Sequence, residues 1–293
     1  MKGKIIKLLF AFIMTLLFLV LFISIGLGIG VFNSRSVIKG IDQSDYYSKA
    51  YNAINQKAER LLSEASLNEE LLSDLITAGR VHVDGMNYVN AILNNKSQHI
   101  SDIYQDVVSH ITNDLYIQSD DSLNNNNSIG SNDWLTNMSI ESDDLSARIH
   151  ELATAIEYEY KSEVELRFVD YLMIYKADYI KIMIILIPCT LLLIFFLTYL
   201  LIRMHKYRHR GIRYIAYAII ASSVLIIITA SYWLLSKKYI DPTIVPDYYN
   251  QFISSYIKMG ITVYVYIGIL GIIIALALIT LIGHMRNKIL YKK

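Results

Sequence analysis

Four long apolar stretches alternate with polar segments along the chain. They cover residues 8–32, 182–202, 214–235 and 259–282, and none of them contains Asp, Glu, Lys, Arg or His. A helix that crosses a bilayer needs about 20 mostly apolar residues, and each stretch meets that length. The sequence therefore predicts an all-α integral membrane protein with four transmembrane helices.

The first apolar stretch has two interpretations, a cleaved secretory signal or an anchor that stays in the membrane. It follows a short basic segment, residues 1–7, as both kinds of segment do. Its apolar run is longer than the 7–15 residues of a signal core, and no clear A-x-A cleavage site follows it. We therefore expect residues 8–32 to be an uncleaved signal anchor.

The charged residues are divided unequally between the segments that flank these spans. Segments 1–7, 203–213 and 283–293 hold 12 Lys and Arg and no acidic residue, whereas segments 33–181 and 236–258 hold 15 basic residues and all 26 acidic ones. Short loops rich in Lys and Arg stay in the cytoplasm. We therefore expect a multi-pass protein of the cell membrane with a cytoplasmic N-terminus, loop and C-terminal tail. Residues 33–181 become an extracytoplasmic domain, and residues 236–258 an outer loop.

The segment between the first two spans shows the apolar spacing of helices. Three stripes recur at steps of three and four: Tyr47, Tyr51, Ile54, Ala58, Leu61 and Ala65; Ile100, Ile103, Val107, Ile111 and Leu115; Leu145, Ile149, Leu152 and Ile156. This period is typical of helices that bury one face. We expect a small helical bundle, with a self-associating coiled coil as the alternative, although the repeats are short for one. The polar stretch 119–133 is expected to be a loop.

Local signals predict where some of these helices begin and end. Ser66 and Glu69 fit a capping box, which predicts a helix that starts at Ser66 and stops near Gly79. Residues 81–85 then form a short link. A further helix is expected from about residue 142, and because no glycine or proline interrupts the chain before Pro188, it is predicted to run unbroken into the second span.

The loop 203–213 is the most basic stretch of the chain. Its cations, Arg203, Lys206, Arg208, Arg210 and Arg213, mark the cytoplasmic side and are expected to contact anionic lipid headgroups. Eleven residues between two spans offer no fold that reads bases, so no nucleic-acid partner is expected. His205 and His209 could place two imidazoles on one helix face, but the surrounding cations disfavour a metal ion. We predict neither a metal nor a cofactor.

Small residues in the first and fourth spans favour close helix packing. They are Ser24, Gly26, Gly28, Gly30, Gly271 and Ala275, and most are spaced four apart. Such spacing lets two helix backbones approach each other in a membrane. The same faces could join copies of the chain, so a homo-oligomer is an open alternative.

Four glutamates near the second span form an acidic patch among tyrosines: Glu157, Glu159, Glu163 and Glu165. One interpretation is a solvated helix face beside an interfacial aromatic belt. The other is a docking surface for a basic partner, either another membrane protein or an extracellular ligand.

The functional hypotheses fall into three classes. The first is a non-enzymatic accessory, sensor or protective protein that binds a partner through its acidic extracytoplasmic domain. The second is an oligomeric channel or small transporter, in which Ser222, Ser223, Thr229 and Ser231 line a pore. The third is a membrane enzyme that uses His82 and Asp84 in a turn between two glycines. Cys189 is the only cysteine, so no disulfide forms within the chain, and the Lys, Ile and Asn usage resembles that of a low-GC bacterium.

Overall fold

The computed structural model describes residues 2–96, 100, 102–124, 142–205, 208–240 and 246–290. Every regular element in these residues is helical. The helices are α1 (Lys2–Gly26), the π-helix η1 (Leu27–Val31), α2 (Ser34–Ser44), α3 (Tyr46–Glu64), α4 (Ala78–Leu93), α5 (Tyr104–Asn124), α7 (Ser142–Val164), α8 (Arg167–Arg203), α9 (Arg208–Ser236) and α10 (Asp247–Leu290).

Four helices among the described residues are long and apolar enough to cross a membrane: Ile5–Val31, Arg167–Arg203, Arg210–Ser236 and Asp247–Met285. This confirms the prediction of an all-helical chain with four candidate spans. The helices divide between two compact units. The membrane unit consists of Met1–Ser44 and Leu172–Lys293, and the polar unit consists of Asp45–Tyr171.

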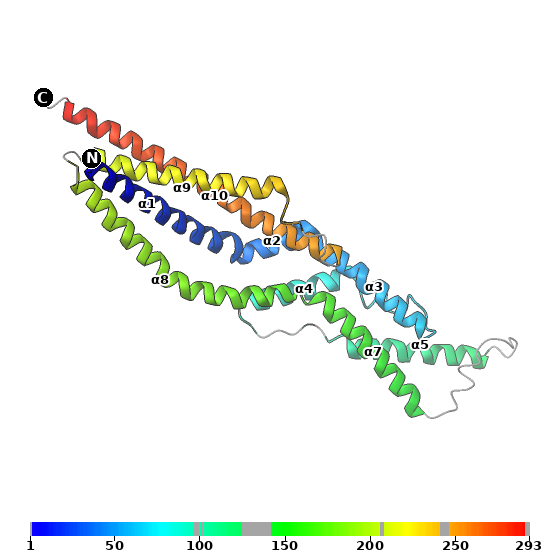
Figure 1. Cartoon of the computed structure of the whole chain (residues 1–293). Coiled ribbons are helices and arrows are strands. Elements are labelled where there is room, and N and C mark those ends of the chain that lie inside the picture. The colour runs from blue at the N-terminus through cyan, green and yellow to red at the C-terminus, as the bar shows by residue number, and fades with distance from the viewer. Residues whose placement is uncertain are drawn as a thin grey trace. The chain divides into compact units, whose positions relative to one another are not determined.

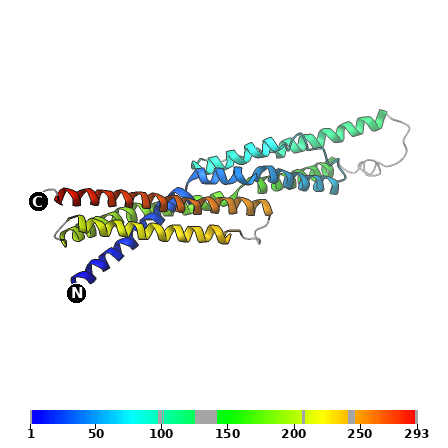
Figure 2. The same cartoon turned by 90° about the horizontal axis from the view of Figure 1, so that it is seen from above.

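In the membrane unit, α1, α9 and α10 lie side by side (Figures 1 and 2). One apolar cluster joins Met14 of α1 to Leu197 of α8 and Ala218 of α9, and a second surrounds Phe22 of α1 and Ala275 of α10. The start of α1, the junction of α8 with α9 and the end of α10 all lie at one end of this unit (Figure 1). The three basic segments of the sequence therefore contain helix ends that lie together.

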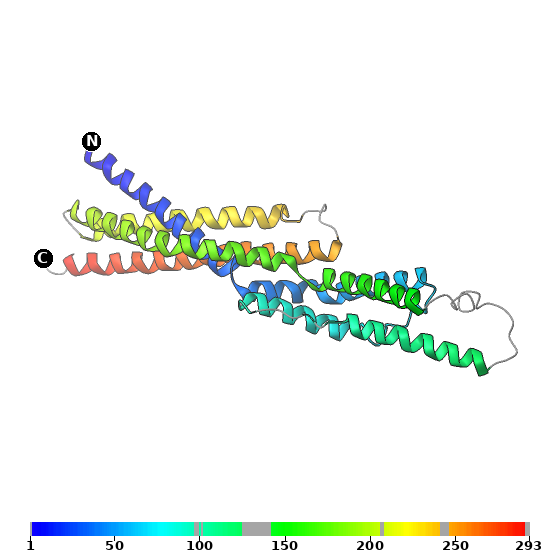
Figure 3. The same cartoon turned by 90° about the horizontal axis from the view of Figure 1, so that it is seen from below.

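In the polar unit, α7 packs against α3, α4 and α5 (Figure 3). The predicted stripes supply much of its core: Tyr47, Ile54 and Ala58 of α3, Ile103, Val107 and Ile111 at α5, and Ile156 of α7 are buried. The 3.6-residue period was thus a reliable guide to which helix faces are buried. Helix α5 extends to Asn124, so the first residues of the predicted loop 119–133 are helical and the rest lie outside the described residues.

The prediction that Ser66 starts a helix is wrong, because Ser66 ends one. Its backbone has a positive φ of 59°. The Leu67 N–H donates to the Leu62 carbonyl (2.9 Å) and the Ser66 N–H donates to the Ser63 carbonyl (2.9 Å). These two bonds define a Schellman motif at the C-terminus of α3. Ser is common at helix starts. The sequence motif alone did not reveal that the Ser66 backbone adopts the left-handed conformation that ends a helix.

Replacing Ser66 by Gly is expected to stabilise the polar unit by roughly 0.5–1 kcal/mol, because glycine adopts positive φ without the steric cost that Ser carries. Asn95 ends α4 with a similar φ of 53°, and Asn tolerates this region. Asn95→Gly should therefore gain less. Native-state hydrogen exchange in the full chain measures both changes, from the α3 amides for Ser66→Gly and from the α4 amides for Asn95→Gly. A loss of stability in Ser66→Gly would contradict the motif.

Two further local predictions are wrong. Gly79 does not stop a helix but lies in the first turn of α4, whose N-cap Thr77 accepts a hydrogen bond from the Arg80 N–H. The helix from residue 142 does not run unbroken into the second span, because α7 ends at Val164 and α8 begins at Arg167. Val164 and Leu166 are both fully buried. Residues two apart point to opposite sides of one helix, so the break lets both enter the core.

Candidate functional site

The cations of the basic loop lie around the junction of α8 and α9. Arg203 is the last residue of α8, Arg208 is the first of α9, and the side chains of Arg203, Arg210 and Arg213 are exposed. Lys206 lies outside the described residues. Because α8 ends at Arg203 and α9 begins at Arg208, His205 lies outside both helices and does not share a helix face with His209. The Nδ1 atom of His205 instead lies 2.7 Å from the Leu201 carbonyl oxygen.

The small residues of the first span lie against bulky or backbone neighbours within the membrane unit. A Cβ built on Gly26 would lie 2.2 Å from the Tyr264 ring, and one on Gly30 would lie 3.1 Å from the Gly260 carbonyl oxygen. The Cβ of a residue at position 28 would meet the Tyr179 hydroxyl at 2.9 Å. These glycines therefore admit parts of α8 and α10.

The remaining small residues are also packed inside this unit. A Cβ on Gly271 would lie 2.2 Å from the Ser223 Oγ, and Ala275 is fully buried. Ser24 is buried, and its carbonyl accepts a hydrogen bond from the Tyr179 hydroxyl (2.6 Å). Small residues at these positions are accounted for by contacts within one chain, without a second copy.

The hydroxyl groups of the third span bond to their own helix or lie in its packing surface. Ser222 Oγ donates to the Ile219 carbonyl at 2.9 Å, and Thr229 Oγ1 donates to the Leu225 carbonyl at 2.9 Å. Ser223 is buried, and its Oγ has no hydrogen-bond partner among the described residues. This arrangement is typical of hydroxyls in membrane helices and offers no specific support for a pore.

His82 and Asp84 lie in the middle of α4, so the predicted turn between two glycines does not exist. Asp84 accepts a hydrogen bond from the buried Tyr160 hydroxyl at 2.7 Å, and the Arg80 Nε lies 4.0 Å from the same oxygen. Burial, and then the hydrogen bond to Asp84, raise the pKa of Tyr160. The Tyr160–Asp84 hydrogen bond joins α7 to α4, so Asp84 has a structural contact in the polar unit.

Three of the four patch glutamates are held in ion pairs within the polar unit. Lys57 Nζ of α3 lies 2.7 Å from Glu159 and 2.8 Å from Glu163, and Lys161 pairs with Glu157. Burial lowers the pKa of Lys57, but its bonds to the two glutamates outweigh this and raise it. The two Lys57 contacts fasten α3 to α7, whereas the Lys161–Glu157 pair lies within α7. Together these contacts reduce the negative charge that the patch offers to a partner. Glu165 is half-buried just after α7.

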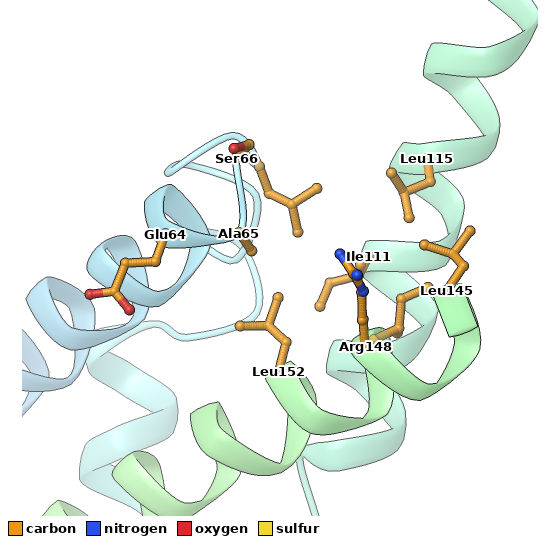
Figure 4. Close-up of a pocket in the computed structure, with 10 residues that line it drawn as sticks. Glu64, Ala65, Ser66, Ile111, Leu115, Leu145, Arg148 and Leu152 are labelled. Carbon is orange, nitrogen blue, oxygen red and sulfur yellow. The ribbon is translucent and has the colours of Figure 1, made fainter. Parts of the chain in front are cut away.

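The pocket drawn in Figure 4 lies between the end of α3, α5 and α7, and has a volume of about 290 Å³. Side chains from all three elements converge on it, among them Leu67, Ile111, Leu115, Leu145 and Leu152. Arg148 lies among them, whereas the carboxylate of Glu64 points away from the pocket (Figure 4). The interior is thus mainly apolar, with one cation at its wall.

Exposed acidic side chains occur at and near the residues that line this pocket. Glu64 is exposed at its edge, and Glu69 and Glu70 are exposed two and three residues after the lining residue Leu67. A second hollow of about 510 Å³ follows α3 and α7 beside it, and its lining includes Glu151 and Glu159. We call the exposed Glu64, Glu69, Glu70 and Glu151 the acidic rim.

The pocket is an apolar hollow with acidic residues near its lining. No group of three His, Cys, Asp or Glu side chains that could hold a metal ion occurs among the described residues. An apolar hollow beside carboxylates can take an apolar side chain whose neighbours are Lys or Arg. Sequence reasoning missed it because its three walls come from residues 64–67, 111–115 and 145–152, which share no local pattern.

No protein-family model matches the chain, and neither the curated proteins nor the solved structures show a significant match to it. The site itself is therefore the basis for a functional argument.

Proposed function

We propose that the chain is a non-enzymatic binding protein of the cell membrane, whose polar unit lies outside the cytoplasm and holds a basic partner protein at the acidic rim. The charge of the polar unit carries this proposal. Residues 45–171 contain 22 Asp and Glu against 8 Lys and Arg. Four of these cations pair with carboxylates of the same unit: Lys57, Arg60, Arg80 and Lys161. The acidic residues still outnumber the basic ones by a wide margin, so the net charge of the unit is strongly negative.

The membrane orientation rests on the basic segments. All 12 cations of residues 1–7, 203–213 and 283–293 belong to segments whose adjoining helix ends lie together in the membrane unit (Figure 1). Because cytoplasmic loops carry the excess of Lys and Arg, that end is assigned to the cytoplasm. Both termini are then inside and residues 45–171 are outside.

Reporter fusions test the orientation. A reporter inserted within 203–213 should be active only in the cytoplasm, and one inserted within 119–133 only outside. The reverse pattern would overturn the orientation, and with it the extracytoplasmic partner.

The partner surface is tested with an amphipathic peptide of alternating Lys and Leu against the full chain in nanodiscs. We expect binding that weakens as salt rises, since surface charges are screened. Glu69→Gln with Glu70→Gln should weaken binding by several fold. The control, Asp45→Asn with Asp102→Asn, removes the same charge from two exposed sites away from the pocket lining and should leave binding nearly unchanged.

The two double variants distinguish binding at the acidic rim from attraction to the net negative charge of the polar unit. Equal weakening by both double variants would show attraction to net charge alone and would overturn the assignment to the acidic rim. No binding to the wild type at low salt would overturn the proposed function. In cells, a photocrosslinking residue in place of Leu67 should capture a discrete basic protein, whereas one at Asp102 should not.

A further inference from the structure

Two hollows adjoin at the end of the membrane unit opposite the basic loop. The first lies between α1, α9 and α10 and has a volume of about 530 Å³. Ile23, Ala230, Trp233, Ile257 and Tyr264 are among its lining residues, and nearly all of its surface is apolar. Because these residues belong to helices that are long and apolar enough to cross a membrane, we expect this hollow to open to the hydrocarbon of the bilayer.

The second hollow is polar and has a volume of about 310 Å³. Its lining comes from α2, from the chain just after α9 and from α10, and includes Gln43, Tyr239, Ser254 and Lys258. Consecutive residues of α10 line the two hollows, Ile257 the apolar one and Lys258 the polar one. An apolar hollow with a polar one at the neighbouring residue of the same helix fits a molecule with a tail and a headgroup.

Three lysines belong to the segments that line the two hollows or directly adjoin their lining residues. Lys258 lines the polar hollow, and Lys237 and Lys238 directly follow the last residue of α9. Lys238 Nζ lies 3.3 Å from the Tyr232 hydroxyl and 5.7 Å from the centre of its ring. Tyr232 follows Thr229, which lines the apolar hollow, by three residues on the same helix face. The cation is therefore held beside the mouth of the apolar hollow.

The charge at this end is unusual for a non-cytoplasmic loop. Residues 236–258 carry three Lys and two Asp, although loops on that side are commonly poor in cations. Cations at the membrane surface attract anionic lipid headgroups. Trp233 and Tyr239 supply the aromatic rings that favour the level of the headgroups.

We propose that the two hollows together form a binding site for one anionic phospholipid of the bilayer. One acyl chain lies in the apolar hollow between α1, α9 and α10. The phosphate lies at Lys237, Lys238 and Lys258, and the rest of the headgroup enters the polar hollow. The lipid binds without a chemical step, and its place between α1 and the α9–α10 pair makes it part of the packing of the membrane unit.

Tryptophan fluorescence tests this directly, because the chain has only two tryptophans, Trp134 and Trp233. Trp134→Phe leaves Trp233 as the only reporter, in the wall of the apolar hollow. The full chain is placed in bilayers that contain a small fraction of a phospholipid with brominated chains, which quench a tryptophan that they touch. We expect brominated phosphatidylglycerol to quench Trp233 at a lower mole fraction in the bilayer than brominated phosphatidylcholine does. The mole fraction needed for half-quenching should be lower by roughly fivefold for each lysine that contacts the headgroup.

Substitutions test the headgroup part and the acyl-chain part of the proposed site separately. Lys237→Gln, Lys238→Gln and Lys258→Gln together should abolish the preference for the anionic lipid, whereas Lys181→Gln, an exposed lysine on α8, should keep it. Ala230→Leu fills the apolar hollow and should reduce quenching by both lipids. Quenching in proportion to the bulk fraction of each lipid would overturn the site. Loss of the preference on adding soluble glycerol phosphate would assign the cations to a soluble anion and would also overturn it.

Discussion

Gly85→Ala is expected to destabilise the polar unit by about 1–3 kcal/mol, the typical cost when a well-packed core receives an extra group. A Cβ on Gly85 would lie 2.0 Å from Tyr47 Cε1 and 2.2 Å from Cζ. The Tyr47 ring cannot move aside easily, because it is 1% exposed and packs edge-on against Tyr46 at 5.1 Å and His82 at 6.1 Å. In most helices the same substitution is favourable by about 1 kcal/mol, so the expected sign is reversed.

Gly79→Ala is the matched control for this variant. Gly79 belongs to the same helix, and a Cβ there would meet nothing within 4 Å. It should leave stability unchanged or raise it by under about 1 kcal/mol. Hydrogen exchange of α3 and α4 amides in the full chain, in nanodiscs, measures both. If Gly85→Ala were as stable as Gly79→Ala, the packing of α4 on Tyr47 would be wrong.

The polar unit is expected to lose stability steeply above about pH 10. Burial raises the pKa of Tyr47, Tyr88 and Tyr160 above the ordinary value of 10.0, and hydrogen bonds from Tyr88 to Asp170 (2.6 Å) and from Tyr160 to Asp84 (2.7 Å) add to this. In the unfolded chain these hydroxyls release their protons near pH 10, whereas in the folded unit they keep them. The stabilisation is therefore complete below pH 10 and is lost as the pH rises further.

Each such tyrosine contributes a slope of about 1.4 kcal/mol per pH unit, so the three together contribute up to about 4 kcal/mol per unit. Denaturant unfolding of the full chain between pH 8 and pH 12, followed by tyrosinate absorbance, measures this slope. A flat profile up to pH 12 would show that these hydroxyls are not buried as described.

Tyr47→Phe provides the internal check on this slope. The Tyr47 hydroxyl is buried and has no hydrogen-bond partner among the described residues, so its removal should raise stability near neutral pH by about 1 kcal/mol. The alkaline slope should also decrease by about 1.4 kcal/mol per pH unit. Ser66→Gly, which leaves every tyrosine in place, should raise the whole curve and keep its slope.

Particular residues show where sequence reasoning was sufficient and where it failed. Ile103, Val107 and Ile111 were assigned to a buried face from their spacing alone, and all three are fully buried. Ser66 was misassigned because a helix start and a helix end can share one residue type, and only the positive φ separates them. The break at Glu165 and Leu166 has no glycine or proline to announce it, since it arises from packing at Val164 and Leu166.

The candidate site depended still more on tertiary contacts. The patch glutamates are neighbours in sequence, but Lys57, about 100 residues earlier in the chain, bonds to both Glu159 and Glu163 and offsets part of their charge. No periodicity predicts such a pair, because it requires α3 and α7 to lie against each other. The acidic rim and its pocket depend on the same packing of α3, α5 and α7.

Residue order by itself determined the four candidate spans, the division of charge between the segments and the apolar faces of the helices. These properties are local, since they depend only on the length and period of apolar residues and on where the charges fall. Tertiary structure decided which glycines admit a neighbouring ring, which carboxylates are paired and where hollows form. Those features need residues tens to hundreds of positions apart to meet, as Gly85 and Tyr47 or Gly30 and Gly260 do. Such a contact forms only when helix packing brings the two distant residues together.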